Sequence, residues 1–211
     1  MHGPEFSDDF REQFRDLLRW RRDVRRFKPD PLPGGILEEI LALTRFAPSV
    51  GLSEPWRYVR VTSPEVRAQI KADFEQANAQ ALRGYMGEQA ALYAGLKLAG
   101  LDSAPVHLAA FCDRNCTQGS GLGRQTMPET AEYSLVAAIN TLWLAARAYG
   151  IGVGWVSIFN PERVSAILSV PSEWRLVAYL CVGYPEQESL TPELETAGWE
   201  RRSAEVLLLE R

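Results

Sequence analysis

The chain has 211 residues, of which 46% are hydrophobic, and this length favours one domain with a sizeable core over two domains. Its net charge of −4 and pI near 5.4 argue against general nucleic-acid binding. No run approaches the roughly 18 apolar residues that span a bilayer, and the first residues lack the pattern of a signal peptide. Three cysteines and two histidines, at no framework or ligand spacing, argue against disulfides and zinc, so we expect a cytoplasmic protein without a metal.

The first predicted helix begins directly after Ser7, whose hydroxyl can cap it, and acidic residues follow in its first turn. Its apolar residues recur at helical spacing, so we expect one face of this helix to be buried. These residues are Phe10, Phe14, Leu17 and Leu18. The helix should end near residue 20, where the sequence becomes strongly basic.

Residues 20–27 form a basic cluster in which four arginines surround a single acid, Asp23. Arginine carries a rigid, permanently charged fork of donors that suits phosphate. A solvated basic face would give the same pattern, so both interpretations stay open at this point. The arginines of the basic cluster are Arg21, Arg22, Arg25 and Arg26.

The next stretch predicts a linker, a helix and a strand. Prolines and glycines over 29–35 indicate the linker, and a helix with apolar positions from Leu37 to Leu43 should stop at Ala47-Pro48. A turn-rich loop over 47–56 then leads into a strand over 57–62, whose alternation predicts one buried face.

Thr62 and Glu65 have the spacing of a capping box, which predicts that a helix begins there. The alanine-rich stretch from about residue 75 to residue 100 should also be helical, with a break near Gly84 or Gly87. A continuous apolar run over 106–112 then predicts a strand.

A polar, glycine-containing loop follows over about 113–128 and is interpreted as a flexible lid. The elements after it are predicted as a central, buried helix over 129–149 ended by Gly150, a strand over 153–158, a helix over 160–168 capped by Asn160, and a strand over 176–182. Residues 186–211 are weakly patterned and predict a C-terminal arm. The whole chain, 1–211, is therefore expected to form one α+β domain.

The sequence has no Gly-x-Ser-x-Gly elbow, no Walker loop and no His-Glu-x-x-His pair. The glycines of the 113–128 loop do not follow a strand in the way that the dinucleotide-binding fingerprint requires. What remains is the basic cluster, the loop that ends in Trp56, and Ser157 with Trp155 and two glycines close before it. Together these pieces indicate a site for a phosphorylated, planar, aromatic ligand.

Four stretches resemble motifs of the nitroreductase-type FMN proteins. Residues 21–25, Arg-Arg-Asp-Val-Arg, are similar to the Arg-Arg-Ser-x-Arg opening of that family, and residues 47–56, Ala-Pro-Ser-Val-Gly-Leu-Ser-Glu-Pro-Trp, to its Ala-Pro-Ser-x-x-Asn-x-Gln-Pro-Trp loop. The later landmarks are Gly-Ile-Gly-Val-Gly-Trp over 150–155 and Val-Gly-Tyr-Pro over 182–185. The resemblance implies a nitroreductase-like fold with a central mixed β-sheet flanked by helices, in an intertwined homodimer that binds FMN at the subunit interface.

Three positions depart from the general motif: Asp23 replaces a serine or threonine, Leu52 an asparagine and Glu54 a glutamine. With residues 121–130 and Ser157, these departures resemble one branch of the family, the 5,6-dimethylbenzimidazole synthases. The resemblance implies that reduced FMN and molecular oxygen are converted into 5,6-dimethylbenzimidazole, the lower ligand of vitamin B12, with release of erythrose 4-phosphate. Flavin is then a substrate, which a separate NAD(P)H-dependent flavin reductase would supply in reduced form.

Two alternatives remain open at the level of sequence. One is an NAD(P)H-dependent nitroreductase or quinone reductase of the same fold, which would recycle FMN unchanged. The other is a non-catalytic flavin-binding protein, which would bind FMN without net chemistry in air.

The resemblance also implies roles for individual residues. Arg21, Arg22 and Arg25 would hold the FMN phosphate and ribityl chain, with Val24 in the same motif. Asp23 would contact the flavin and accept and return protons, and the alternative for it is a structural ion pair with Arg22 or Arg26.

Ser157 is the second predicted catalytic and flavin-contacting residue, and its alternative is a small residue that fills a tight strand. Ser49 would contact the phosphate or ribityl group, or else serve a turn or cap, and Leu98 would lie along the flavin or in plain core. Arg201 and Arg202 would add a basic patch, unless they belong to a solvated terminus. Outside the site, His107 is expected to be a hydrogen-bonded core residue, and Cys112 and Cys116 are expected to take no part in chemistry.

Overall fold

The computed structural model describes residues 3–96 and 99–211 of the chain. One sheet of four strands runs through it in the order β1-β2-β4-β3, and every neighbouring pair of strands is antiparallel. The strands are β1 (Trp56–Arg60), β2 (Val106–Asp113), β3 (Gly152–Val156) and β4 (Trp174–Gly183). The predicted α+β class is confirmed. A mixed sheet was expected, and among the described residues its parallel pairing consists of one bridge, between Asp23 and Val153.

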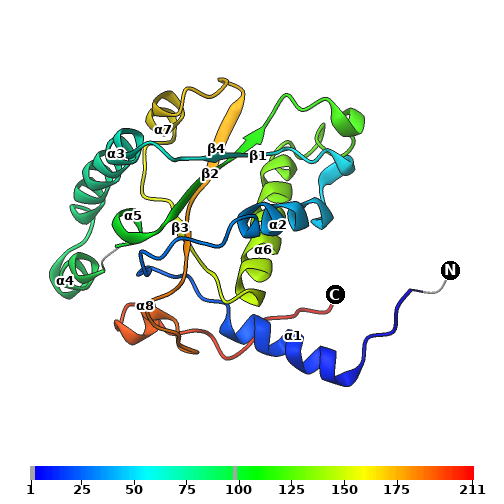
Figure 1. Cartoon of the computed structure of the whole chain (residues 1–211), viewed down its shortest axis with the longest axis horizontal. Coiled ribbons are helices and arrows are strands. Elements are labelled where there is room, and N and C mark those ends of the chain that lie inside the picture. The colour runs from blue at the N-terminus through cyan, green and yellow to red at the C-terminus, as the bar shows by residue number, and fades with distance from the viewer. Residues whose placement is uncertain (1–2, 97–98) are drawn as a thin grey trace.

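Helices cover both faces of this sheet (Figure 1). On one face α6 (Thr130–Ala148) and α2 (Ile36–Leu43) build a core that includes Ile40, Leu135 and Leu142. On the other face α3 (Pro64–Leu82) and α7 (Pro161–Ile167) build a second core. Because β2 is buried on both faces, its sequence is a continuous apolar run and not an alternating one. The prediction of a central, buried helix over 129–149 is confirmed by α6.

The remaining helical segments lie outside these two cores or are short. They are α1 (Asp8–Trp20), α4 (Gly87–Gly95), α5 (Gly100–Ser103) and α8 (Glu193–Thr196), with 3₁₀ turns η1 (Thr44–Phe46), η2 (Val50–Leu52) and η3 (Gln118–Gly121). The predicted break near residue 84 or 87 is confirmed, since α3 ends at Leu82 and α4 begins at Gly87, where φ is +58°. Among the described residues, the helices are too short or too polar to cross a membrane.

Side chains cap three of the helices. The Ser7 hydroxyl accepts from the Phe10 N–H at 3.2 Å, and Asn160 caps α7, both as predicted. For α3 the prediction of Thr62 was wrong by one residue, because Ser63 accepts from the Val66 N–H at 3.2 Å. The reason is Pro64, whose fixed φ and missing N–H favour the first helical position and so place the cap immediately before it.

The apolar face of α1 is not buried within the chain, contrary to the prediction. Phe10, Phe14 and Leu18 are each 45% exposed, and no residue of α1 is buried. In Figure 1, α1 lies at the edge of the molecule beside the end of α6. Helical periodicity predicts that an apolar face is buried, but it does not show whether the face packs against the same chain or against another one.

His107 and Tyr179 form a buried polar pair between β2 and β4. His107 Nδ1 lies 2.9 Å from the Tyr179 hydroxyl, and both side chains are 2% exposed or less. Burial lowers the pKa of His107 to about 4, and it raises the pKa of Tyr179. His107 is therefore a neutral, hydrogen-bonded core residue, as expected.

The lowered pKa of His107 predicts a loss of stability in mild acid. The unfolded chain binds the proton with a pKa near 6.5 and the folded chain with one of about 4, so stability is present above about pH 6.5 and falls as the pH is lowered toward 4. The shift corresponds to about 3 kcal/mol at most. Urea unfolding across this window should show a smaller decline for His107→Gln, whose amide can still bond Tyr179. An unchanged slope in that variant would contradict the assignment.

Candidate active site

The basic cluster lies along the edge of β3 and is not a solvated face. The Val24 N–H donates to the Val153 carbonyl at 3.0 Å, and Asp23 and Val153 form the parallel bridge. Four residues further on, the Lys28 N–H donates to the Tyr184 carbonyl at 2.8 Å, and the Phe27 side chain is fully buried. These contacts fix the backbone that carries the arginines.

Two glycines of β3 make this close approach possible. A Cβ on Gly152 would lie 2.6 Å from Val24 Cγ2, and a Cβ on Gly154 would collide with the Val24 carbonyl oxygen. Neither glycine has positive φ, so the requirement is space and not conformation. Gly152 and Gly154 therefore mark the part of β3 against which the basic cluster packs.

Asp23 is anchored by β3 as well. Its Oδ1 accepts the Trp155 N–H at 2.9 Å, and its Oδ2 lies 3.8 Å from Arg25 Nε. Burial raises the pKa of Asp23, and the Trp155 N–H and the positive charges of Arg25 and Arg21 oppose that rise. The side chain nonetheless keeps 40% of its surface exposed, so the carboxyl is accessible to a ligand.

The predicted alternative partners of Asp23 were wrong in detail. The nearest cation is Arg25, whereas Arg26 pairs with Glu193 at 3.1 Å. Arg22 instead donates to the backbone carbonyls of Arg19 and Arg21. At 3.8 Å the contact with Arg25 is too long for a hydrogen bond, so a structural ion pair is a weak explanation for the presence of an acid at position 23.

Two arginines of the basic cluster hold buried donors that the described residues leave unpaired. These atoms are Arg22 Nε and Arg25 Nη1, and the Arg25 side chain is only 12% exposed. Burial lowers the pKa of Arg22, with further contributions from the positive charges of Arg202 and Arg21. Because buried guanidinium donors are costly without a partner, this arrangement fits an anionic ligand such as a phosphate.

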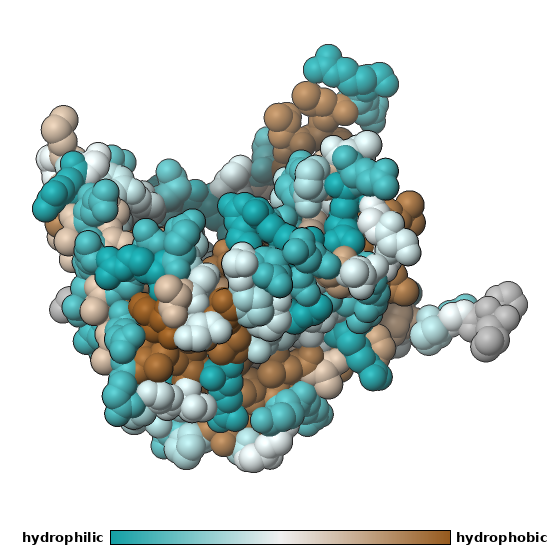
Figure 2. Space-filling model, turned by 90° about the horizontal axis from the view of Figure 1, so that it is seen from above, coloured by the Kyte–Doolittle hydropathy of each residue, from teal (hydrophilic) through white to brown (hydrophobic). Residues whose placement is uncertain are grey.

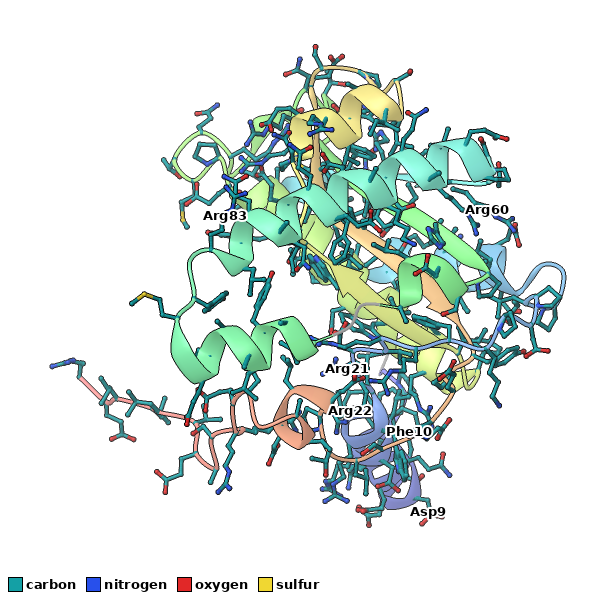
Figure 3. All side chains as sticks on the ribbon, turned by 90° about the vertical axis from the view of Figure 1, so that its left-hand side faces the viewer. Asp9, Phe10, Arg21, Arg22, Arg60 and Arg83 are labelled. Carbon is teal, nitrogen blue, oxygen red and sulfur yellow. The ribbon has the colours of Figure 1, made fainter. Side chains whose placement is uncertain are left out.

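Helix α6 fixes the cluster from the other side. The Trp143 Nε1–H donates to the Arg22 carbonyl at 3.1 Å, and the Arg21 guanidinium stacks 5.0 Å above the Trp143 ring. Figure 3 shows Arg21 and Arg22 together where α1 runs into the sheet. The sequence did not single out Trp143, because a tryptophan at a helical core position is ordinarily only packing.

A cavity of ≈ 350 Å³ opens beside the basic cluster. Its walls include Arg22, Asp23 and Arg25, the end of α4 at Leu96, and the end of α8 at Thr196. A larger concavity of ≈ 1030 Å³ lies between α6 and residues 114–128. There Arg114 already makes two hydrogen bonds to Glu132, at 3.0 and 2.8 Å, so the smaller cavity is the better anion site.

Ser157 follows β3 directly and its side chain is exposed. It lies two residues beyond Trp155, which places it roughly 7 Å further along the strand direction than the N–H that holds Asp23. The structure thus puts both predicted catalytic residues on one strand edge, but Ser157 does not line the cavity beside Asp23. An exposed hydroxyl also does not fit the alternative of a small residue that fills a tight strand.

Ser49 lies away from the basic cluster. Its hydroxyl accepts the Glu54 N–H at 3.3 Å, which is the turn role considered as its alternative. The neighbouring Val50 N–H donates to Ser134 Oγ near the start of α6, whereas Trp143 holds Arg22 nine residues further along that helix. At about 1.5 Å per residue, these two points are about 13 Å apart. Within one chain the predicted phosphate contacts are therefore not brought together.

Residues 113–128, the predicted lid, brace the loop that carries Ser49. Gln118 Nε2 donates to the Leu52 carbonyl at 2.8 Å, and Cys116 Sγ to the Ser53 carbonyl at 3.0 Å. A Cβ on Gly119 would collide with the Gly51 carbonyl oxygen, so the glycine permits a close backbone approach. Closure of this segment over a ligand stays a prediction.

Leu98 lies outside the described residues, and the remaining predicted residues do not line this cavity. Arg201 and Arg202 are exposed, but Arg202 is near enough to depress the pKa of Arg22. Burial raises the pKa values of the Cys112 and Cys181 thiols to about 12, which leaves both unreactive at neutral pH.

Comparison with known proteins identifies the class. The model of the nitroreductase family matches residues 18–184. The chain therefore belongs to the nitroreductase family, and the prediction of an oxidoreductase of this class is confirmed. The fold is shared with oxidized iodotyrosine deiodinase bound to FMN and 3-iodo-L-tyrosine, with a TM-score of 0.75 and 24% identity over 93% of this chain and 98% of that one.

Within the family, the predicted resemblance to one branch is confirmed. The chain is 52% identical over 200 residues to the 5,6-dimethylbenzimidazole synthase of Rhodospirillum rubrum, which covers 95% of each protein. It is 48% identical over 195 residues to that of Rhodobacter capsulatus, which covers 92% of this chain and 94% of the relative. A BluB-like flavoprotein from Clostridium difficile 630 shares the fold, with a TM-score of 0.64 and 20% identity over 87% of this chain and 96% of that one.

The packing of the basic cluster on β3 predicts a severe effect for Gly154→Ala. The added methyl group would push the Val24 carbonyl away and break the bridge at Asp23, for which we expect a loss of about 1–3 kcal/mol or more in the free energy of unfolding. Gly34→Ala is the control, since no atom lies within 4 Å of its added Cβ. Chemical denaturation measures both, and equal stability of the two variants would refute the proposed packing constraint.

Proposed function

We propose that this chain converts reduced FMN, with molecular oxygen, into 5,6-dimethylbenzimidazole and releases erythrose 4-phosphate. The observation that carries the proposal is Asp23, an acid held by the Trp155 N–H beside buried arginine donors that lack a partner. The names of the relatives at 52% and 48% identity support the same product. FMN is then a substrate, and its product is the lower ligand of vitamin B12.

The chain's own residues have three tasks in this proposal. Reduced FMN supplies the ring that reacts with oxygen and the ribityl carbon that enters the product. Arg22 and Arg25, with Arg21 and Val24 of the same motif, hold the phosphate and ribityl chain. Asp23 takes and returns protons through Oδ2, because Oδ1 is occupied by the Trp155 N–H. Ser157 acts from the same strand edge as a second hydrogen-bonding group.

The site is proposed to be completed by a second copy of the chain. Ser49 cannot reach an FMN phosphate at the basic cluster of its own chain, so the partner in a homodimer would supply this loop. Large apolar side chains also remain exposed on α1 and over residues 206–209. Residues 206–209 are each 62–95% exposed. Figure 2 shows apolar residues exposed on one face of the single chain and on a segment that projects from it.

Reduced FMN is proposed to come from a separate NAD(P)H-dependent flavin reductase in the cytoplasm. The sequence has no recognisable motif for a nicotinamide dinucleotide, and Gly119 and Gly123 of the 113–128 segment pack against the 49–54 loop. A lid movement of the 113–128 segment would exclude water while the flavin reacts.

The proposal is tested by mixing the protein with chemically reduced FMN, admitting oxygen and following products by mass spectrometry. We expect 5,6-dimethylbenzimidazole and erythrose 4-phosphate to accumulate as FMN disappears. Quantitative return of oxidised FMN would overturn the proposal. Steady NAD(P)H oxidation by the protein alone would then identify a nitroreductase or quinone reductase, and tight FMN binding without turnover would identify a flavin-binding protein.

Asp23→Asn should bind FMN but lose product, by about 100-fold or more if the carboxylate is the general base. Burial raises the pKa of Asp23, so the activity of the wild type should fall on acidification at a higher pH than an ordinary aspartate would give. The residual activity of the variant should not show this fall. The folded state favours the protonated form, so the neutral amide should not lower the melting temperature near pH 7. The measurement is the product yield of the wild type and of the variant as a function of pH. A variant that yields as much product as the wild type would show that Asp23 has no role in the mechanism.

Arg25→Gln should weaken FMN binding by about 10- to 100-fold, because a charge-assisted contact to phosphate is lost. Riboflavin, which has the ribityl chain but lacks the phosphate, should lose less affinity than FMN in this variant. Arg26→Gln is the matched control, since Arg26 is half exposed and pairs with Glu193. Flavin fluorescence titration measures the affinity of each protein for FMN and for riboflavin. An equal loss of affinity for the two flavins would show that Arg25 does not contact the phosphate.

A further inference from the structure

One buried carboxylate has no part in the chemistry proposed above. Asp73 lies on α3, and its side chain is 1% exposed. Its Oδ2 accepts the Asn160 N–H at 2.9 Å, and its Oδ1 lies 3.1 Å from Arg163 Nε. A charge in such a position is costly unless it is paired, and breaking such a pair is strongly destabilising. The acid therefore binds α3 firmly to the chain around residue 160.

The Asn160 N–H needs this acceptor from another helix. Asn160 is the N-cap of α7, and its Oδ1 accepts the Arg163 N–H at 2.9 Å. In a capping box, the side chain at the Arg163 position would return a bond to the N–H of the cap residue. Arginine is only a donor, so it cannot do so. Asp73 makes the missing bond across the gap between α3 and α7.

The same turn is held by its aromatic residue. The Phe159 ring packs edge-on against Phe74 of α3 at 6.0 Å and lies 5.4 Å from Tyr179 of β4. On the other side of the turn, Val156 is the last residue of β3 and pairs with Tyr179. Ser157 lies between these two fixed points, and its own side chain is exposed.

We propose that Asp73 is a positioning residue, which fixes the turn over 157–160 and thereby the backbone that carries Ser157. The inference rests on the proposed function, since it gives Ser157 its task. Without the carboxylate the Asn160 N–H loses its acceptor, and the backbone around Ser157 would sample several conformations. The flavin should still bind, because Asp73 does not line the cavity beside the basic cluster, but less of it should be converted into product.

A double-mutant cycle tests the proposal in the dimethylbenzimidazole assay. Asp73→Leu keeps the approximate size of the side chain but removes both acceptor oxygens, and it should lower the ratio of product to re-oxidised FMN by about 10-fold, with FMN affinity unchanged. Ser157→Ala should lower the same ratio, and the double variant should be no worse than Ser157→Ala. Asp102→Asn, which removes an exposed acid 2.6 Å from Lys71 of α3, should leave the ratio unchanged.

Hydrogen exchange supplies a readout that does not depend on turnover. Amides of residues 157–160 should exchange faster in Asp73→Leu than in the wild type, while β3 stays protected. If that variant does not fold, Asp73→Asn, whose amide oxygen can still accept the Asn160 N–H, weakens only the ion pair with Arg163 and should show smaller changes of the same sign in both readouts. Additive effects in the cycle, or unchanged exchange, would overturn the role of Asp73. Failure of the wild type to form product would instead overturn the proposed function.

Discussion

The site depends on one contact, the packing of residues 23–27 against the edge of β3. Two glycines of that strand leave room for the Val24 backbone, and the Trp155 N–H then meets the Asp23 carboxylate. The positions of the buried arginine donors and of the acid follow from this geometry. The arginine donors lie under the surface, the acid points toward the cavity, and Phe27 anchors the segment in the core. A bulkier strand would displace the basic cluster into solvent, where its charges would be screened.

Helix α6 relates the two halves of the proposed site to one another. It holds Arg22 through Trp143 near its C-terminal end and the Ser49 loop through Ser134 near its N-terminal end. A rigid helix between the two keeps them apart in one chain, and it would also keep them in fixed register across a two-fold axis. The uncovered apolar residues of α1 and of the C-terminal arm fit the same requirement, since both need cover that this chain does not give.

Periodicity and caps predicted the α+β class, the buried helix and the strands to within a few residues, because these features depend on local chemistry. The sequence motifs also located the basic cluster correctly. The packing of α1, the partner of Asp23 and the role of Trp143 could not be predicted, since each depends on which distant segments meet. Asp73 is the clearest case. An acid in a polar, alanine-rich helix is ordinarily solvated, and only the fold reveals that Asp73 accepts the Asn160 N–H.

The acid at position 23 changes what the arginine clamp can do. A hydroxyl there could donate one hydrogen bond, but it could not exchange a proton near neutral pH. A fully solvated carboxylate would stay ionised near neutral pH and would be too weak a base to accept a proton readily. Burial raises the pKa of Asp23, whereas the Trp155 N–H and the arginines keep it from remaining permanently protonated. The opposing effects bring the two protonation states closer in free energy, which a group needs if it both accepts and returns a proton in one reaction.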